Sequence, residues 1–389
     1  MQPRSTKLLL PVIIVAQFAG TSLWFAGNAI IDVIQKDTGS HANITSVVQL
    51  GFIAGTLIFS LFTIADRFSG PRVFFASAVI ASLANLLIIP FATDTGLLLT
   101  LRFITGFFLA GIYPVGMKIA ADLFPERLGR ALGFLVGALV LGTAFPHLVR
   151  SQFKEINWEA VLLFTSALAT AGGIMILLLV PQRSKNTPAN KPDLLAAFTV
   201  FRSKPFRSAA FGYFGHMWEL YAFWAILPVL IAAYNQLHGS QLNVYLWSFV
   251  VIAAGAFGCA AGGLISQRAG SKKVAFYSLL LSGICCLLSF LAFRTAPATF
   301  LIFLVAWGLT VTPDSPQFST LVARNAASRN KGTALTIVTC IGFAITIGSI
   351  QLLQHMFDSF GEYGLLVLAP GPLLGLIALR TPKEGDQPN

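Results

Sequence analysis

Long apolar runs separated by short polar segments make up the sequence from residue 8 to residue 380. Each run has about the 20 residues that a helix needs to cross the hydrocarbon core of a bilayer. Strands of an outer-membrane barrel would instead alternate polar and apolar residues in segments of about ten. The pattern therefore predicts an all-α membrane protein with twelve transmembrane helices, at about 8–34, 44–65, 73–92, 96–121, 131–150, 158–180, 209–234, 242–266, 274–293, 298–322, 333–355 and 363–380.

One polar stretch is much longer than the other breaks and divides the helices into two sets of six. We predict an N-terminal bundle over 1–180, a linker over 181–208 and a C-terminal bundle over 209–389. Apolar residues at helical spacing in the linker favour a short amphipathic helix on the membrane surface, and a solvated linker is the alternative. These apolar residues are Leu194, Leu195, Phe198 and Phe201.

The composition agrees with a membrane protein, because 56% of the residues are hydrophobic, 11% are charged and the mean hydropathy is +0.76. The net charge of +11 could suggest nucleic acid as a partner. If both termini are cytoplasmic, however, 20 of the 26 basic residues fall in the inner segments. This bias follows the positive-inside rule, so the basic excess sets membrane orientation and excludes nucleic acid. We expect a multi-pass protein of the bacterial inner membrane with both termini cytoplasmic.

The two sets of helices repeat each other at an offset of about 200 residues. The loop over 65–72 matches the loop over 266–273, and the loop over 127–133 matches the loop over 329–335. Duplicated six-helix units are typical of secondary transporters, in which two halves rock about a site between them.

The first repeated loop carries Asp66, Arg67, Gly70 and Arg72, and on these residues the chain resembles the major facilitator superfamily over its whole length. In that family the loop is a charge latch that closes the cytoplasmic side, which implies that Asp66 pairs with a basic residue of a neighbouring loop. We assign six residues to the gate: Asp66, Arg67, Gly70, Arg72, Arg127 and Arg130. The second copy has Gln267 at the aspartate position, which weakens the case for a second latch.

Two further elements bear on coupling and direction. Arg102, with Gly106 four residues later, resembles a family element of helix four that is linked to proton coupling. Helix five has glycines of the antiporter motif but no adjacent Gly-Pro, which weakens an assignment as an exporter. Glycine pairs in helices two, five and eight also predict close helix contacts, either between the halves or within one half. The pairs are Gly51 and Gly55, Gly133 and Gly137, and Gly258 and Gly262.

Four charged residues stand out inside the predicted helices, away from their ends: Arg102 and Lys118 in helix four, Glu219 in helix seven and Asp314 in helix ten. A charge at the centre of a membrane helix costs roughly 2.5–3.5 kcal/mol on insertion scales, so each of them needs a reason. Helices one, four, seven and ten line the central cavity in the resembled fold. We therefore predict a polar, water-accessible cavity that is the transport site.

His216 and Glu219 are three residues apart and share a helix face, which favours a proton-coupling pair near the midplane. A purely structural His–Glu hydrogen bond is the alternative. Asp314 lies between Pro313 and Pro316, where a broken helix suits a proton or substrate site. The alternative role for Asp314 is a salt bridge to Lys118 or to a loop arginine. The proton-coupling candidates are Glu219, His216, Asp314 and Arg102.

The predicted substrate-binding residues come from helices one, four, seven and ten. They are Arg102, Lys118, Trp24, Asn28, Gln17, Trp218, Tyr221, Trp224 and Gln317. The two basic residues favour a solute with negative charge, whereas the aromatic residues of helix seven suit a drug or metabolite.

We therefore expect a monomeric secondary transporter that moves a small polar or anionic solute by alternating access, in symport with protons. The alternatives are a proton-coupled exporter of drugs or metabolites and a membrane sensor or assembly protein that does not transport. No nucleophile motif, metal-ligand spacing or phosphate loop is present, so neither an enzyme nor a cofactor is expected.

Overall fold

The computed structural model describes residues 6–28, 44–124, 128–152, 158–182, 200–326 and 331–380. Within these ranges the chain is helical and has no strand. The elements of the first half are α1 (Thr6–Thr21), α3 (Ile44–Leu61), α4 (Ile64–Arg67), α5 (Gly70–Leu86), α6 (Ile88–Phe91), α7 (Thr95–Leu109), α8 (Tyr113–Leu123), α9 (Leu128–Gln152) and α10 (Trp158–Leu179).

The second half begins with a short 3-10 turn and ends in a broken helix. Its elements are η3 (Val200–Arg202), α12 (Lys204–His238), α13 (Val244–Ala269), α14 (Ser271–Ala292), α15 (Pro297–Thr310), α16 (Asp314–Asn325), α17 (Lys331–Phe360), η5 (Gly361–Leu368) and α18 (Pro370–Leu379).

Ten helical stretches of the described residues are long and apolar enough to cross a membrane. The first predicted helix is represented by a shorter apolar segment, Leu8–Thr21, and the last long stretch, Gly332–Leu379, contains both α17 and α18. Adding the short segment and dividing the last stretch at η5 gives the twelve segments that the apolar runs predict. The predicted linker extends to residue 208, but α12 already begins at Lys204, and the predicted amphipathic helix lies mostly outside the described residues.

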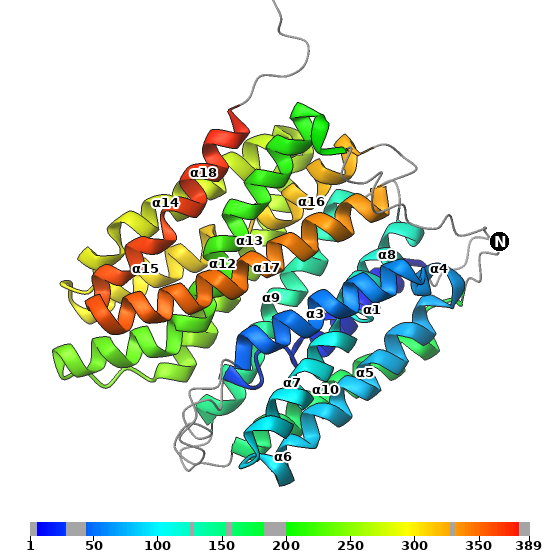
Figure 1. Cartoon of the computed structure of the whole chain (residues 1–389), viewed down its shortest axis with the longest axis horizontal. Helices are drawn as coiled ribbons and strands as arrows, with labels where there is room; N and C mark the ends of the chain where they lie inside the picture. The colour runs from blue at the N-terminus through cyan, green and yellow to red at the C-terminus, as the bar shows by residue number, and fades with distance from the viewer. Residues whose placement is uncertain are drawn as a thin grey trace, which may run out of the picture.

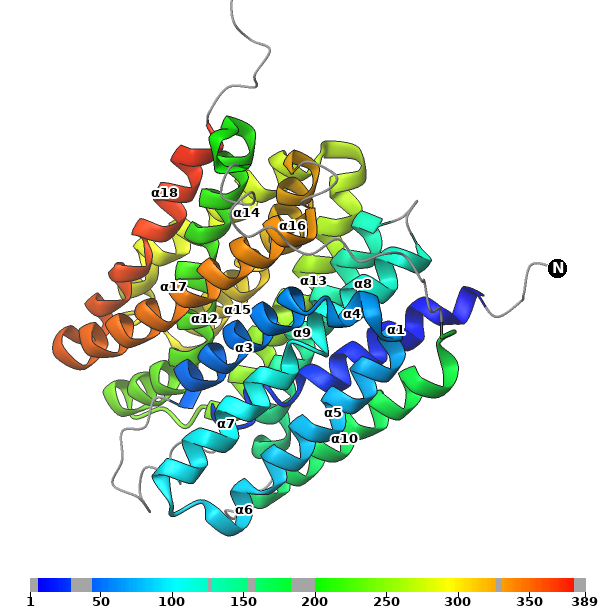
Figure 2. The same ribbon diagram turned by 45° about the vertical axis from the view of Figure 1, so that its right-hand side comes forward.

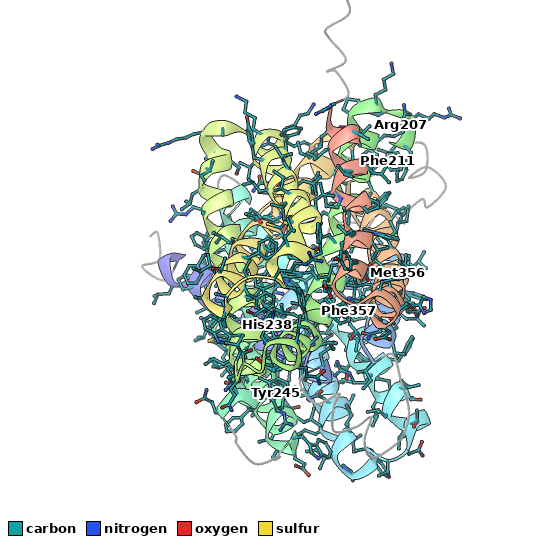
Figure 3. All side chains as sticks on the ribbon, turned by 90° about the vertical axis from the view of Figure 1, so that its left-hand side faces the viewer. Arg207, Phe211, His238, Tyr245, Met356 and Phe357 are labelled. Atoms are coloured by element: carbon teal, nitrogen blue, oxygen red, sulfur yellow. The ribbon has the colours of Figure 1, made fainter. Side chains whose placement is uncertain are left out.

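Helices of the first half lie on one side of the molecule and those of the second half on the other (Figures 1 and 2). We call the end that holds Val180 and Lys204 the linker end, and the end that holds Gln152 and His238 the far end. In Figure 3, Arg207 lies at the linker end and His238 lies toward the far end.

Three of the predicted helices are interrupted near their middle. Helix one stops at Thr21 and continues as turns to Asn28. Helix four breaks between α7 and α8, and helix ten breaks between α15 and α16, so the breaks occupy matching places in the two halves. A proline sits in the first turn of α8, and Pro313 caps α16. A proline has no backbone N–H, so it begins a helix well but leaves carbonyls of the preceding turn without a donor.

The halves meet along two pairs of helices, α9 with α13 and α3 with α17. Gly133 of α9 faces Gly263 of α13 so closely that a Cβ on Gly133 would lie 3.1 Å from the Gly263 Cα. Gly137 makes a similar approach to the Ala256 carbonyl, at 3.1 Å. The predicted contact between helices five and eight is therefore observed between the halves.

The other glycine pairs pack within one half. A Cβ on Gly51 would lie 2.1 Å from the backbone oxygen of Phe103 in α7, and one on Gly258 would lie 2.3 Å from that of Leu309 in α15. Helix two therefore uses its glycines to approach helix four rather than helix eleven. For these pairs the structure shows packing within one half, the second of the two alternatives, because a neighbouring backbone of the same half already fills the space.

Candidate functional site

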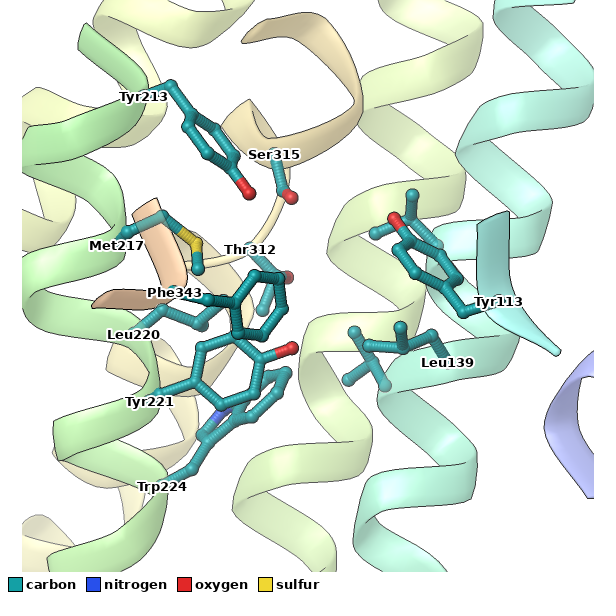
Figure 4. A pocket seen from close by; sticks show the side chains of 12 residues that line it. Tyr113, Leu139, Tyr213, Met217, Leu220, Tyr221, Trp224, Thr312, Ser315 and Phe343 are labelled. Atoms are coloured by element: carbon teal, nitrogen blue, oxygen red, sulfur yellow. The ribbon is translucent and has the colours of Figure 1, made fainter. Parts of the chain in front are cut away.

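A pocket lies between the two halves near the middle of the bundle (Figure 4). Twelve residues line it. From the first half come Tyr113, at the start of α8, and the aliphatic side chains of Val136, Leu139 and Val140 on α9. Helices seven, ten and eleven of the second half form the opposite wall. We call this space the central pocket.

The wall from the second half combines aromatic rings with hydroxyl groups. Tyr213, Met217, Leu220, Tyr221 and Trp224 follow one face of α12, and Phe343 comes from α17. Thr312 lies in the break of helix ten and Ser315 in the first turn of α16. In Figure 4 the Tyr213 and Ser315 hydroxyls lie on the same side of the space, across from the Tyr113 ring. None of the twelve lining residues is charged, so the structure gives no polar, charged lining of the kind that the sequence predicts.

Aromatic rings from both halves pack together beside the central pocket. Tyr221 lies 5.1 Å from Phe343 and 5.3 Å from Trp224 between ring centroids, and Trp24 stacks on Phe343 at 5.5 Å with an interplanar angle of 23°. These distances are typical of favourable aromatic pairs. The full set, which we call the aromatic cluster, is Trp24, Phe25, Phe52, Tyr221, Trp224 and Phe343.

His216 pairs with Asp314 rather than with Glu219. The His216 Nδ1 lies 2.9 Å from the Asp314 Oδ1, and both side chains are buried, with 0% and 1% of their surface exposed. Asp314 is the first residue of α16, where the partial positive charge of a helix N-terminus favours a carboxylate.

Glu219 faces the opposite way, into the interior of the second half. The Trp307 indole N–H donates to its Oε1 at 2.7 Å, the Ser282 hydroxyl donates to its Oε2 at 2.8 Å, and the Cys286 thiol approaches Oε1 at 3.3 Å. The Trp307 ring stacks on Phe223 at 4.3 Å. The sequence places His216 and Glu219 on one face, but residues three apart on a helix diverge enough for each side chain to be taken by a different neighbour.

Arg102 is completely buried in the first half, at 0% exposure, so it does not reach the membrane surface. Its guanidinium donates to the Trp24 carbonyl at 2.7 Å and to the Asn85 side-chain oxygen at 3.1 Å, with longer contacts of 3.4 Å to the Leu23 carbonyl. Leu23 and Trp24 belong to the unwound part of helix one, whose carbonyls lack helical donors. Arg102 therefore holds the break of helix one, and it does not line the central pocket.

Lys118 reaches toward the linker end. Its ammonium donates to the Ala65 carbonyl at 2.7 Å and forms a close ion pair with the Asp66 carboxylate, which we call the linker-end ion pair. The resemblance implied a partner for Asp66 from a neighbouring loop, whereas the structure supplies Lys118 from α8 of the same half. Lys118 does not line the central pocket, and neither Lys118 nor Asp314 pairs with the other.

The remaining predicted gate residues surround this pair. Arg67, Arg72 and Arg130 are exposed, and Gly70 is partly exposed. Arg130 lies over the Phe134 ring of its own helix at 5.7 Å. Arg127 lies outside the described residues. Arg67, Arg72 and Arg130 form no ion pair with any residue that the structure describes.

Of the other predicted substrate-binding residues, only Tyr221 and Trp224 line the central pocket. Trp24 belongs to the aromatic cluster and donates to Gln49 at 3.3 Å. Asn28 donates to Thr45 at 2.6 Å, and Trp218 donates to the Val367 carbonyl at 2.9 Å, on the side of α12 that faces η5. Gln17 and Gln317 are also buried and outside the pocket lining. The Gln17 amide has no partner among the described residues.

Sequence reasoning missed most of the pocket lining. Tyr113, Thr312, Ser315 and Phe343 are uncharged residues of apolar runs, so a search for expensive intramembrane charges passes over them. One signal was available: Tyr113 and Thr312 occupy the breaks of helices four and ten, beside Pro114 and Pro313. Breaks at matching places in the two halves mark the site in many transporters.

Comparisons with known proteins agree with this architecture. The family described as the Major Facilitator Superfamily matches residues 12–350. The agnestins efflux protein AgnL12 of Paecilomyces divaricatus is 23% identical over 355 residues, which cover 88% of this chain and 77% of that protein. The niacin transporter NiaP of Acinetobacter baylyi is 35% identical over 113 residues, 26% of this chain and 25% of that protein.

Two solved structures share the fold over nearly the whole length. The Major Facilitator Superfamily transporter FucP, in an outward conformation, gives a TM-score of 0.69 at 16% identity and covers 97% of this chain and 99% of its own. A bacterial homolog of the human lysosomal transporter Spinster, in an inward-facing and unoccupied conformation, gives a TM-score of 0.63 at 15% identity and covers 97% of this chain and 95% of its own. This multi-pass membrane protein belongs to the Major Facilitator Superfamily of transporters.

Proposed function

We propose that the chain is a secondary active transporter that carries a small solute through the central pocket by alternating access. One observation carries this proposal: the pocket is walled by α8 and α9 of the first half and by α12, α16 and α17 of the second. A rocking movement of one half against the other would therefore change which end of the pocket is open. The close Gly133–Gly263 approach supports this, because it supplies a smooth surface about which the halves can turn.

We further propose that transport is coupled to protons through His216 and Asp314. Both residues stand directly behind the pocket wall, since His216 precedes Met217 and Asp314 lies between Thr312 and Ser315. A buried imidazole and carboxylate whose nearest atoms lie 2.9 Å apart form a pair that can gain or lose a proton with a small shift. Glu219 has three donors on its carboxylate and holds helices together, so we assign it a positioning role.

The direction of coupling separates two candidates. The first candidate is proton symport, in a protein that we assign to the bacterial inner membrane with the linker end in the cytoplasm. The second candidate is proton-coupled efflux, and the match of AgnL12 over most of the chain favours it. The sign of the driving gradient distinguishes them. Symport concentrates solute in vesicles when the bath is more acidic than the lumen, whereas antiport does so when the lumen is more acidic.

Proteoliposomes loaded with the purified full-length protein test the proposal. Counterflow of a labelled solute, with benzamide as the first probe in a panel of neutral, anionic and cationic compounds, reports alternating access without a gradient. Imposed pH gradients of both signs then report coupling. We expect Asp314→Asn to abolish gradient-driven accumulation but to retain counterflow, because the pocket wall remains intact.

Trp247→Phe is the matched control, since Trp247 of α13 is a half-buried aromatic residue outside the pocket. This control should keep both activities. Absence of counterflow for every member of the panel would contradict transport and favour a sensor or assembly protein. Accumulation by Asp314→Asn at the wild-type level would contradict the assignment of the proton site.

A further inference from the structure

We propose that the solute of the central pocket is a flat, uncharged ring compound that carries a hydrogen-bond acceptor. The inference rests on the proposed function for its site and goes beyond that function in naming the ligand. It departs from the anionic solute that Arg102 and Lys118 suggest in the sequence.

The absence of charge among the lining residues carries the first step. All twelve lining residues are uncharged. The nearest ionisable groups are committed elsewhere: His216 and Asp314 to each other, and Arg102 to helix one. A charged solute that leaves water needs a compensating charge or several hydrogen bonds, and an unpaired buried charge is strongly unfavourable. The described pocket therefore selects against an ion.

The ring geometry carries the second step. Tyr221 makes tilted contacts with Phe343 at 54° and with Trp224 at 67°, rather than stacking face to face. Offset and edge contacts of this kind are the arrangements that a further flat ring can join. The opposite wall, formed by Leu139 and its neighbours on α9, is aliphatic and fits the other face of a ring.

The third step rests on one unsatisfied donor. Trp224 is fully buried and lines the pocket, yet its indole N–H has no hydrogen-bond partner among the described residues. A buried donor without a partner is costly, so a ligand that supplies an acceptor gains from satisfying it. The hydroxyl groups of Tyr113 and Ser315 lie on opposite walls of the pocket, and either one can bond to a second polar atom of the ligand.

Four compounds of similar size separate these features. Benzamide has a flat ring, an acceptor and no charge. Benzoate adds the charge, cyclohexanecarboxamide removes the flat ring, and toluene removes the acceptor. Binding to the purified full-length protein in detergent is measured by calorimetry or by thermal stabilisation, with Trp224→Phe to remove the donor and Trp247→Phe as the control.

We expect benzamide to bind and the other three compounds to bind more weakly. Trp224→Phe should weaken benzamide roughly five- to tenfold, the worth of about one hydrogen bond, while leaving toluene unchanged. Tighter binding of benzoate than of benzamide, equal binding of cyclohexanecarboxamide, or no binding of benzamide at millimolar concentration would overturn the inference.

The two proposals fail in different ways in this design. If benzamide binds as expected but shows no counterflow, the proposed transport is wrong and the ligand class stands. If benzoate alone binds and is exchanged, transport stands and the ligand class is wrong. An unchanged benzamide affinity in Trp224→Phe would overturn the role of the indole N–H.

Discussion

Arg102→Lys tests whether Arg102 positions helix one or binds solute. The substitution keeps a buried positive charge, so the cost of desolvating the charge is retained. A guanidinium offers several donors in a fixed fork, whereas an ammonium on a flexible four-carbon stem acts as a point charge. The lysine is therefore expected to lose at least one of the two good bonds, to the Trp24 carbonyl at 2.7 Å or to Asn85 at 3.1 Å.

The loss of one bond from a charged donor is worth about 1.5–3 kcal/mol. Scaled by the unfolding entropy per residue of globular proteins, this lowers the midpoint of thermal unfolding by roughly 2–4 °C. Thermal unfolding in detergent is measured with and without benzamide, and Arg130→Lys, at an exposed position of α9, is the control. A positioning role predicts a lower midpoint and a nearly unchanged benzamide affinity. A wild-type midpoint combined with a large loss of affinity would refute the reasoning.

Three further substitutions test other contacts of the described structure. Trp307→Phe removes the indole donor of Glu219, and we expect a loss of about 1–3 kcal/mol in chemical unfolding, which an unchanged unfolding curve would contradict. Gly106→Ala puts a Cβ 2.1 Å from the backbone oxygen of Val48. We expect the resulting backbone shift to cost about 1–3 kcal/mol of stability, measured by thermal unfolding. A wild-type midpoint would show that the helices separate freely. Lys118→Met removes the linker-end ion pair, which is partly exposed and worth less than about 1 kcal/mol. Counterflow rates should therefore change while the unfolding midpoint does not. A lower midpoint with unchanged counterflow would make the pair structural.

The fold could be predicted from the sequence because lipid imposes a simple rule on it. A chain that must satisfy its backbone hydrogen bonds in hydrocarbon forms helices, and the apolar runs give their number and approximate bounds. The break in helix one was not predicted. It depends on Arg102, about 80 residues away in sequence, which binds the freed carbonyls of Leu23 and Trp24. No local pattern reports such a distant partner.

The candidate site was predicted only in part, for a related reason. The rarity of charges inside the helices singled out Arg102, Lys118, Glu219 and Asp314, and all of them except Lys118 are buried. Their partners were not predictable, because Ser282 and Trp307 come from other helices whose rotation the sequence leaves open. The pocket lining itself consists of ordinary residues such as tyrosine, serine and leucine, whose role arises only from where the halves meet.

Distances across the two ends of the molecule test alternating access most directly. Spin labels at residues 61 and 332 span the halves at the linker end, and labels at residues 152 and 241 span them at the far end, all at exposed positions. The labels are introduced after the four native cysteines have been replaced. Pulsed electron paramagnetic resonance then gives both distance distributions in nanodiscs, at two pH values and with or without benzamide. The account predicts that one distance lengthens as the other shortens. Two distributions that stay fixed, or that change in the same sense, would contradict it.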